Sequence, residues 1–236
     1  MARGEMATVL RDDPASGGFY TISEVSRYLG IERRERVRRW VVGYDGRDPI
    51  VLCDYKPVSK TQELSFLDLI EVRFIQHFRR QGVSLQSIRV AAKAARRELN
   101  ISHPFAASHM EFVTDRKRIF LHTAEKTGDE RLLDIVRGQY AMYEVMEKLL
   151  AKGLTFDPGT NLAERWYPDQ GNYPMIVLDP HIAFGQSTVE PFGVPTKTLF
   201  EAWRANDGSS EVVAEWFEVE PGSVEQAVDY ELTLEA

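Results

Sequence analysis

The segment from Val177 to Phe200 contains residue types that could carry out acid–base chemistry. Asp179, His181 and Glu190 lie close together there, among prolines and glycines. An imidazole between carboxylates can act as a general acid or base. Asp-Pro followed by histidine is more typical of a turn, and the sequence contains no phosphate-binding glycine loop or nucleophile elbow. We therefore predict no catalytic residues, and an enzyme centred on these three side chains is the least favoured hypothesis.

The histidines and the cysteine do not form a metal-binding pattern. The five histidines lie at positions 77, 103, 109, 122 and 181, and no two have the i, i+4 spacing of a helical ligand pair. Cys53 is the single cysteine, which excludes an internal disulfide and a thiolate-rich metal site. Such cysteine usage fits a reducing compartment. The sequence predicts neither a metal nor a cofactor.

Charge is distributed unevenly along an otherwise ordinary globular composition. The 236 residues are 43% hydrophobic and 28% charged, with a formal net charge of -7. Residues 20–100 contain 16 Lys and Arg against 10 Asp and Glu, a balance of +6, whereas residues 173–236 contain 2 against 12, a balance of -10. The basic part is suited to nucleic acid, and the acidic part indicates a different partner.

No membrane or export signal is recognisable. Residues 1–19 lack the apolar run of a signal peptide, and no stretch of about 18 apolar residues follows that could span a membrane. We expect a flexible N-terminus over 1–19 and a cytoplasmic protein.

Residues 20–41 predict a helix-turn-helix. Thr21 and Glu24 form a capping-box pattern, and Gly30 ends the first helix. The second helix carries an apolar stripe surrounded by arginines, whose planar donors suit phosphates and guanine edges in the major groove. The residues predicted to bind double-stranded operator DNA are Thr21, Arg33, Arg34, Arg36, Arg38, Arg39, Tyr44 and Arg47.

The rest of the basic part extends this pattern. Asp45-Gly46 predicts a turn and Pro49–Tyr55 an extended run, together a hairpin or wing. Two further helices are expected after Ser65 and Ser84, with a break at Gly82. The order T-I-S-E-V, L-G-I, R-R-W, wing, then R-R-Q-G-V-S-L-Q-S-I-R resembles the DNA-binding domain of the MerR family of winged-helix regulators. This resemblance implies a DNA-binding domain over residues 20–100.

The middle region, residues 101–172, is expected to contain a β-hairpin and a long helix. Residues 110–124 read as two strands around a turn at 114–118, and residues 128–153 as the helix. Residues 154–174 are rich in turn formers and read as a connection. The aromatic residues of the region, for which core packing is favoured over a ligand pocket, are Tyr140, Tyr143, Trp166 and Tyr167.

The acidic part, residues 173–236, predicts an extended arm and three helices, the last two forming a second helix-turn-helix. The helices are expected to start at Thr196 as a cap, at Ser209 or Ser210, and at Pro221. Glu225, Asp229 and Glu231 are expected to be exposed and to repel DNA, which favours dimerisation or protein binding. The predicted dimerisation residues are Phe184, Val189, Leu199, Phe200, Trp203, Trp216 and Phe217.

The acidic part also resembles a known family. The motifs I-V-L-D-P-H-I-A-F-G-Q, G-V-P-T-K-T-L, V-V-A-E-W-F-E-V and V-E-Q-A-V-D-Y-E, over residues 173–232, resemble the domain of unknown function 433 family. A MerR-like domain joined to such a domain resembles the larger VapB-type antitoxins. That resemblance implies a PIN-like ribonuclease toxin as the partner.

Two hypotheses therefore remain besides the enzyme, both for a mainly α-helical chain with small β elements. The leading one is a homodimeric type II antitoxin that binds its operator and neutralises its toxin. The alternative is a MerR-type transcription regulator with a ligand-sensing middle region and no toxin partner.

Overall fold

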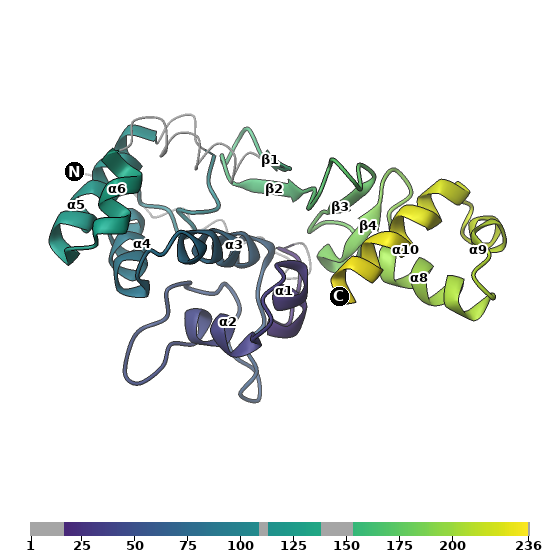
Figure 1. The fold of residues 1–236 in the computed structure, drawn as a ribbon, viewed down its shortest axis with the longest axis horizontal. Coiled ribbons are helices and arrows are strands. Elements are labelled where there is room, and N and C mark those ends of the chain that lie inside the picture. The colour runs from purple at the N-terminus through teal and green to yellow at the C-terminus, as the bar shows by residue number, and fades with distance from the viewer. Residues whose placement is uncertain (1–16, 109–112, 138–152, 236) are drawn as a thin grey trace, which may run out of the picture.

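A computed structural model of the chain describes residues 17–108, 113–137 and 153–235. The fold is mainly helical with a small antiparallel sheet, as predicted (Figure 1). In these ranges no helix is both long and apolar enough to cross a membrane. The helices are α1 (Ile22–Tyr28), α2 (Arg34–Val41), α3 (Phe66–Arg80), α4 (Leu85–Leu99), α5 (Val113–Thr127), α6 (Glu130–Arg137), α8 (Thr196–Ala205), α9 (Ser210–Phe217) and α10 (Pro221–Glu235).

Side-chain caps start several helices where the sequence predicts them. Thr21 Oγ1 accepts a hydrogen bond from the Glu24 amide, and the Glu24 carboxylate accepts one from the Thr21 amide. Ser65 forms the same box with Asp68 at α3, and the hydroxyls of Ser84 and Ser209 cap α4 and α9 by accepting from the amides of Ser87 and Val212. These caps satisfy amides that the first helical turn leaves unpaired. Local sequence thus fixes where the helices begin.

The expected wing is not a regular hairpin. Residues 43–65, all described, contain no strand but two tight turns, closed by the single bridges Tyr44–Arg47 and Val58–Thr61. Proline at positions 49 and 57 removes backbone donors that a ladder would need. The amides of Ile50 and Val51 instead donate to the Trp40 carbonyl and fasten the loop to the end of α2.

The predicted hairpin of the middle region is wrong, because α5 occupies Val113–Thr127. Residues 114–118 offer no glycine, proline or asparagine to make a tight hairpin turn, so helix can continue through them. Helix α6 covers the start of the predicted long helix. The remainder, with Tyr140 and Tyr143, lies outside the described residues.

Residues 154–174, expected to be a connection, instead supply two strands. The sheet has the order β1 (Leu154–Phe156), β2 (Ala163–Trp166), β3 (Ile176–Leu178), β4 (Ser187–Val189) and β5 (Val194–Pro195), all antiparallel. Asp157 Oδ1 accepts from the amides of Gly159 and Thr160 and closes the β1–β2 turn. Strands β3 and β4 pair Val177 with Thr188, so the predicted extended arm folds back on itself.

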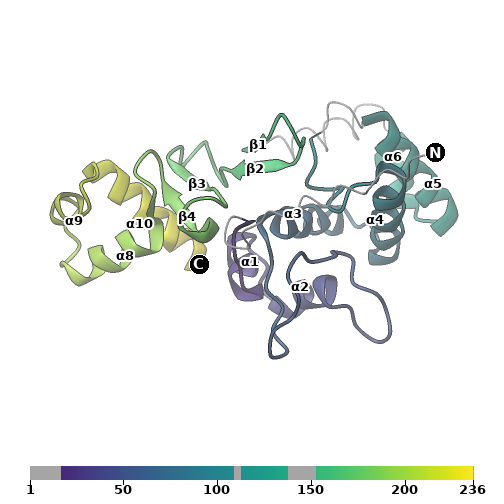
Figure 2. The ribbon, with the colours of Figure 1, turned by 180° about the vertical axis from the view of Figure 1, so that it is seen from behind.

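The described chain has two hydrophobic cores. The first joins the head, which we define as residues 20–100, to the middle region, and includes a stack of Phe74, Phe78, Phe105 and Phe120. The second lies within the acidic domain, residues 173–235, between β3, β4 and the three last helices. Viewed from either side, the sheet runs from above the head to the acidic domain (Figures 1 and 2).

Helix α1 forms the junction between the head and the acidic domain. The Tyr20 hydroxyl donates to the Gly185 carbonyl over 2.7 Å, and the Ser187 amide donates to the Tyr28 hydroxyl over 3.4 Å. Glu231, predicted to be exposed, is 1% exposed, because Arg27 and the Thr196 hydroxyl provide it with partners. Thr196 is therefore not the cap of α8, and Pro195 takes that position.

Candidate functional site

Helix α2 presents the densest set of exposed cations in the head. Val37, Trp40 and Val41 are buried against α1 and the loop that follows, which fixes the opposite side of the helix toward solvent. The arginines on this exposed side, together with the residue that precedes the helix, are Arg33, Arg34, Arg36, Arg38 and Arg39. The apolar stripe thus sets the direction in which the guanidinium groups project.

The position of these arginines does not serve helix stability. Arg34 and Arg36 lie in the first turn of α2, where the helix dipole disfavours positive charge, and Arg33 at the N-cap makes no capping hydrogen bond. Only Glu35 there has the favourable sign. A helix N-terminus crowded with guanidinium groups is suited to an anion such as a phosphate, which supplies the missing negative charge.

The turn after α2 adds two more of the predicted residues. Asp45 and Gly46 both have positive φ, which closes a tight turn and brings Arg47 beside Tyr44. The Arg47 and Arg39 guanidinium carbons lie 5.4 and 5.2 Å from the centre of the Tyr44 ring. This stacking holds both cations close to α2.

Thr21 lies at the edge of this basic surface. Its hydroxyl is already hydrogen-bonded to Glu24 in the capping box. It lines a hollow of about 560 Å³ with Arg34, Arg38 and Lys60. Sequence reasoning missed Lys60, whose only signal is its place in a second tight turn after the predicted wing.

The predicted dimerisation residues fall into three groups by their exposure. Val189, Leu199 and Phe200 are at most 4% exposed and pack in the core of the acidic domain, so they stabilise that domain rather than contact a second copy. Trp203 and Phe217 are half-buried at its edge. The two whose side chains face solvent are Phe184 and Trp216, at 61% and 64%. The Phe184 side chain is exposed at a turn of the backbone, where its φ is 56°.

The structure brings Asp179, His181 and Glu190 together through a residue that sequence reasoning missed. Arg165 lies between the two carboxylates, with Nε 2.9 Å from Asp179 Oδ2 and Nη1 3.2 Å from Glu190 Oε1. Asp179 Oδ1 accepts from the His181 amide and faces its ring at 3.0 Å. Tyr167 donates to Glu190. These contacts fasten the β3–β4 turn to β2, which supports a structural role.

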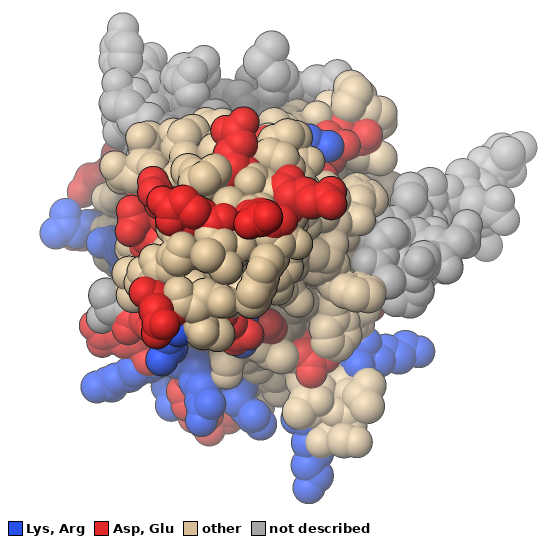
Figure 3. All heavy atoms as spheres, turned by 90° about the vertical axis from the view of Figure 1, so that its right-hand side faces the viewer, with Lys and Arg blue, Asp and Glu red and all other residues tan. Residues whose placement is uncertain are grey.

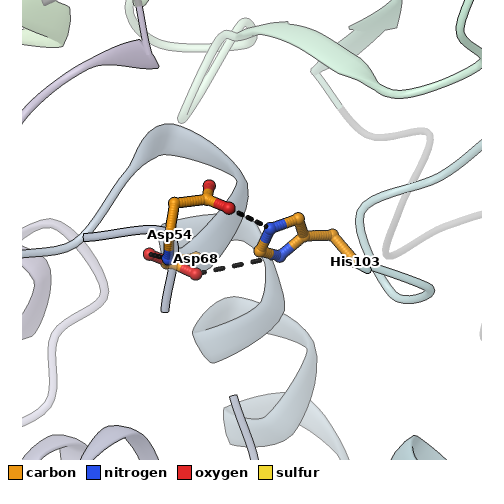
Figure 4. A group of neighbouring side chains, drawn as sticks. All are labelled: Asp54, Asp68 and His103. Atoms are coloured by element: carbon orange, nitrogen blue, oxygen red, sulfur yellow. Dashed lines mark hydrogen bonds and ion pairs between the residues drawn. The ribbon is translucent and has the colours of Figure 1, made fainter. Parts of the chain in front are cut away.

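A second histidine cluster lies in the first core, where the sequence indicated nothing. His103 Nε2 is 2.9 Å from Asp54 Oδ1 and Nδ1 is 3.7 Å from Asp68 Oδ1, on opposite edges of the ring (Figure 4). Burial would lower the pKa of His103, but the hydrogen bond to Asp54 and the neighbouring carboxylates raise it to about 9. Burial raises the pKa of Asp68 to about 7.

This cluster is better described as an ion triad than as a metal centre. Although one ligand atom from each of the three residues lies within 4.8 Å of the others, the two ring nitrogens point to different carboxylates and cannot bind the same ion. A protonated imidazole donates a hydrogen bond from Nε2 to Asp54 and faces Asp68 as an ion pair on its Nδ1 edge. The triad joins the segment after α4 to the start of α3.

The similarity of this chain to known proteins extends over most of its length rather than over one motif. No protein-family model matches the sequence. The chain is 27% identical over 227 residues to a Mycobacterium tuberculosis protein named "Putative antitoxin VapB45", a match that covers 89% of this chain and 92% of the relative. It also resembles the X-ray crystal structure of RV2018 from Mycobacterium tuberculosis, with a TM-score of 0.69 and 27% identity over 89% of this chain and 96% of that one. The likeness therefore includes both the head and the acidic domain.

This relative supports the resemblance to VapB-type antitoxins that the sequence indicated. The resemblances of the head to the MerR family and of the acidic domain to the domain of unknown function 433 family stay predictions.

Proposed function

We propose that this protein is the antitoxin of a type II toxin–antitoxin system. The observation that carries the proposal is the similarity, over 89% of the chain, to the protein named "Putative antitoxin VapB45". In this proposal the chain binds a PIN-like ribonuclease toxin, neutralises it, and acts in the cytoplasm without chemistry of its own.

The second part of the proposal is repression of the antitoxin's own operon. Helix α2 would enter the major groove as a recognition helix, with its exposed arginines and Arg47 on phosphates and bases. A homodimer would present two such helices to half-sites about 34–36 Å apart. Among the predicted dimerisation residues, Phe184 best suits contact with a second copy, since it lies beside the half-exposed Phe19.

A ligand-sensing regulator receives less support from the aromatic residues of the middle region. Trp166 is 4% exposed and lies under the Arg73 guanidinium, whose carbon is 5.3 Å from the ring. Tyr167 donates its hydroxyl hydrogen bond to Glu190. The contact of Trp166 with Arg73 and that of Tyr167 with Glu190 are typical of structural packing rather than of a ligand pocket.

Coexpression tests the antitoxin proposal. A small open reading frame adjacent to the gene of this chain is expressed with and without this chain, and arrest of growth by that frame alone is expected. Rescue of growth and copurification of the two proteins are expected. Arrest that continues unchanged, with no complex on affinity purification, would overturn the proposal.

A further inference from the structure

The outer side of α9 carries apolar side chains that nothing in the described chain covers. Val212 and Trp216 are four residues apart and so lie on the same side of the helix, where they are 38% and 64% exposed. Val213 and Ala214, on the inner side, are buried in the core of the acidic domain. An exposed tryptophan beside a second apolar residue is typical of a binding surface.

Acidic residues flank this apolar pair. Glu211 and Glu215 are exposed and four residues apart, an arrangement in which like charges destabilise a helix. Glu215 also lies in the last turn, where the helix dipole disfavours negative charge and no basic residue compensates. Glu211 lies in the first turn, where the helix dipole favours its charge. Glu215 has no such benefit to α9, so its charge favours a role in binding.

The acidic character extends beyond α9. Residues 205–236 contain nine Asp and Glu and no Lys or Arg. Figure 3 looks onto this end of the molecule, where acidic side chains form a band across the surface. Lys and Arg gather along its lower edge, on the side where Figure 1 places α2. The surface around Trp216 therefore attracts a cationic partner and repels an anionic one.

We propose that the outer side of α9, with Trp216 at its centre and Glu211 and Glu215 beside it, is the docking surface for the cationic, RNA-binding side of the toxin. This inference rests on the proposed function. A ribonuclease must bind phosphates and presents Lys and Arg to do so, which complements the acidic band. A second copy of this chain fits less well, because it would bring four glutamates into one interface without a cation.

Two variants test the surface, each with a matched control. Trp216→Ala is paired with Leu232→Ala, which truncates a 47% exposed side chain on α10. Glu211→Lys/Glu215→Lys is paired with Glu225→Lys/Asp229→Lys, which makes the same charge change on exposed positions of α10. Kd, the association rate and the oligomeric state are measured for the full chain against the purified product of the adjacent open reading frame.

Trp216→Ala is expected to raise Kd by about 30-fold, as for the central residue of an interface. The double charge reversal is expected to slow association by about tenfold at low salt, with a smaller effect at high salt. Leu232→Ala should bind as the wild type does, and Glu225→Lys/Asp229→Lys, which reverses charges elsewhere in residues 205–236, should slow association less than the α9 reversal does. Unchanged binding by both α9 variants, while the wild type binds, would overturn the docking surface and leave the antitoxin proposal standing. Dissociation of a homodimer by Trp216→Ala in the absence of toxin would also overturn it. A wild type that does not bind would overturn both proposals.

Discussion

Arg27 on α1 and Glu231 on α10 form an ion pair across the junction between the head and the acidic domain. Arg27 Nη1 lies 2.8 Å from Glu231 Oε2, and the other carboxylate oxygen accepts the Thr196 hydroxyl. The Glu231 side chain is 2% exposed and that of Arg27 28%. The ion pair thus links α1, the first helix of the predicted DNA-binding pair, to the buried side of the acidic domain.

The first prediction concerns this ion pair. Arg27→Ala would leave the Glu231 carboxylate buried without its cation and should lower the free energy of unfolding by about 2–3 kcal/mol. Urea denaturation measures this change in the free energy of unfolding. Arg97→Ala is the control, since the Arg97 side chain is 79% exposed in its pair with Glu98 and should cost less than about 1 kcal/mol. Equal losses of stability in the two variants would contradict the prediction that the Arg27–Glu231 pair stabilises the junction.

The second prediction concerns DNA. If α2 is the recognition helix, Arg36→Ala should weaken binding to the upstream operator fragment and reduce the slope of log Kd against log salt by about 1. Titration by fluorescence anisotropy at several salt concentrations measures both. Arg204→Ala, which removes an exposed arginine from α8, is the control and should change neither. A salt slope that stays the same in Arg36→Ala would exclude a phosphate contact by this residue.

The third prediction concerns Gly185, whose carbonyl accepts the Tyr20 hydroxyl. Its φ is +85°, and an added Cβ would lie 2.3 Å from the Tyr20 hydroxyl oxygen. Gly185→Ala should lower the free energy of unfolding by about 2 kcal/mol or more, through backbone strain and displacement of Tyr20. Gly30→Ala is the matched control, because φ there is +58° but no atom lies within 4 Å. Gly30→Ala should lower the free energy of unfolding by only about 1 kcal/mol, from backbone strain alone. A Gly185→Ala variant no less stable than Gly30→Ala would show that the contact with Tyr20 contributes nothing.

The parts of the fold that the sequence predicted depend on neighbours in the chain. The capping box of Thr21 and the helix start at Ser209 involve residues no more than three positions away. Strands β1 and β2 were missed because they have three and four residues, too few to show an alternating pattern. Burial of Glu231 could not be predicted either, because its partner Arg27 lies 204 residues away. Contacts between distant residues could not be predicted at the candidate site either. The exposed arginines of α2 follow from their spacing around the apolar stripe, whereas the triad of Asp54, Asp68 and His103 joins residues far apart in the sequence.

The last prediction concerns the pH dependence of stability through His103. The pKa of this residue is raised from 6.5 to about 9 in the folded chain, so folding favours its charged form. Its contribution is therefore complete below pH 6.5 and is lost as the pH rises through 9, with a change on the order of 3 kcal/mol. The raised pKa of Asp68 acts below about pH 7, and the pKa of the Cys53 thiol, raised by burial from its ordinary value of 9.0, adds to the loss only above about pH 9, so the histidine dominates between pH 7 and 9. The free energy of unfolding of the wild type should fall over this range. His103→Gln should be less stable at pH 7, since two carboxylates lose their cation, but it should lack that fall. His181→Gln, whose ring is half-exposed, is the control and should keep the wild-type profile. A fall of equal size in His103→Gln would assign the pH dependence to another group.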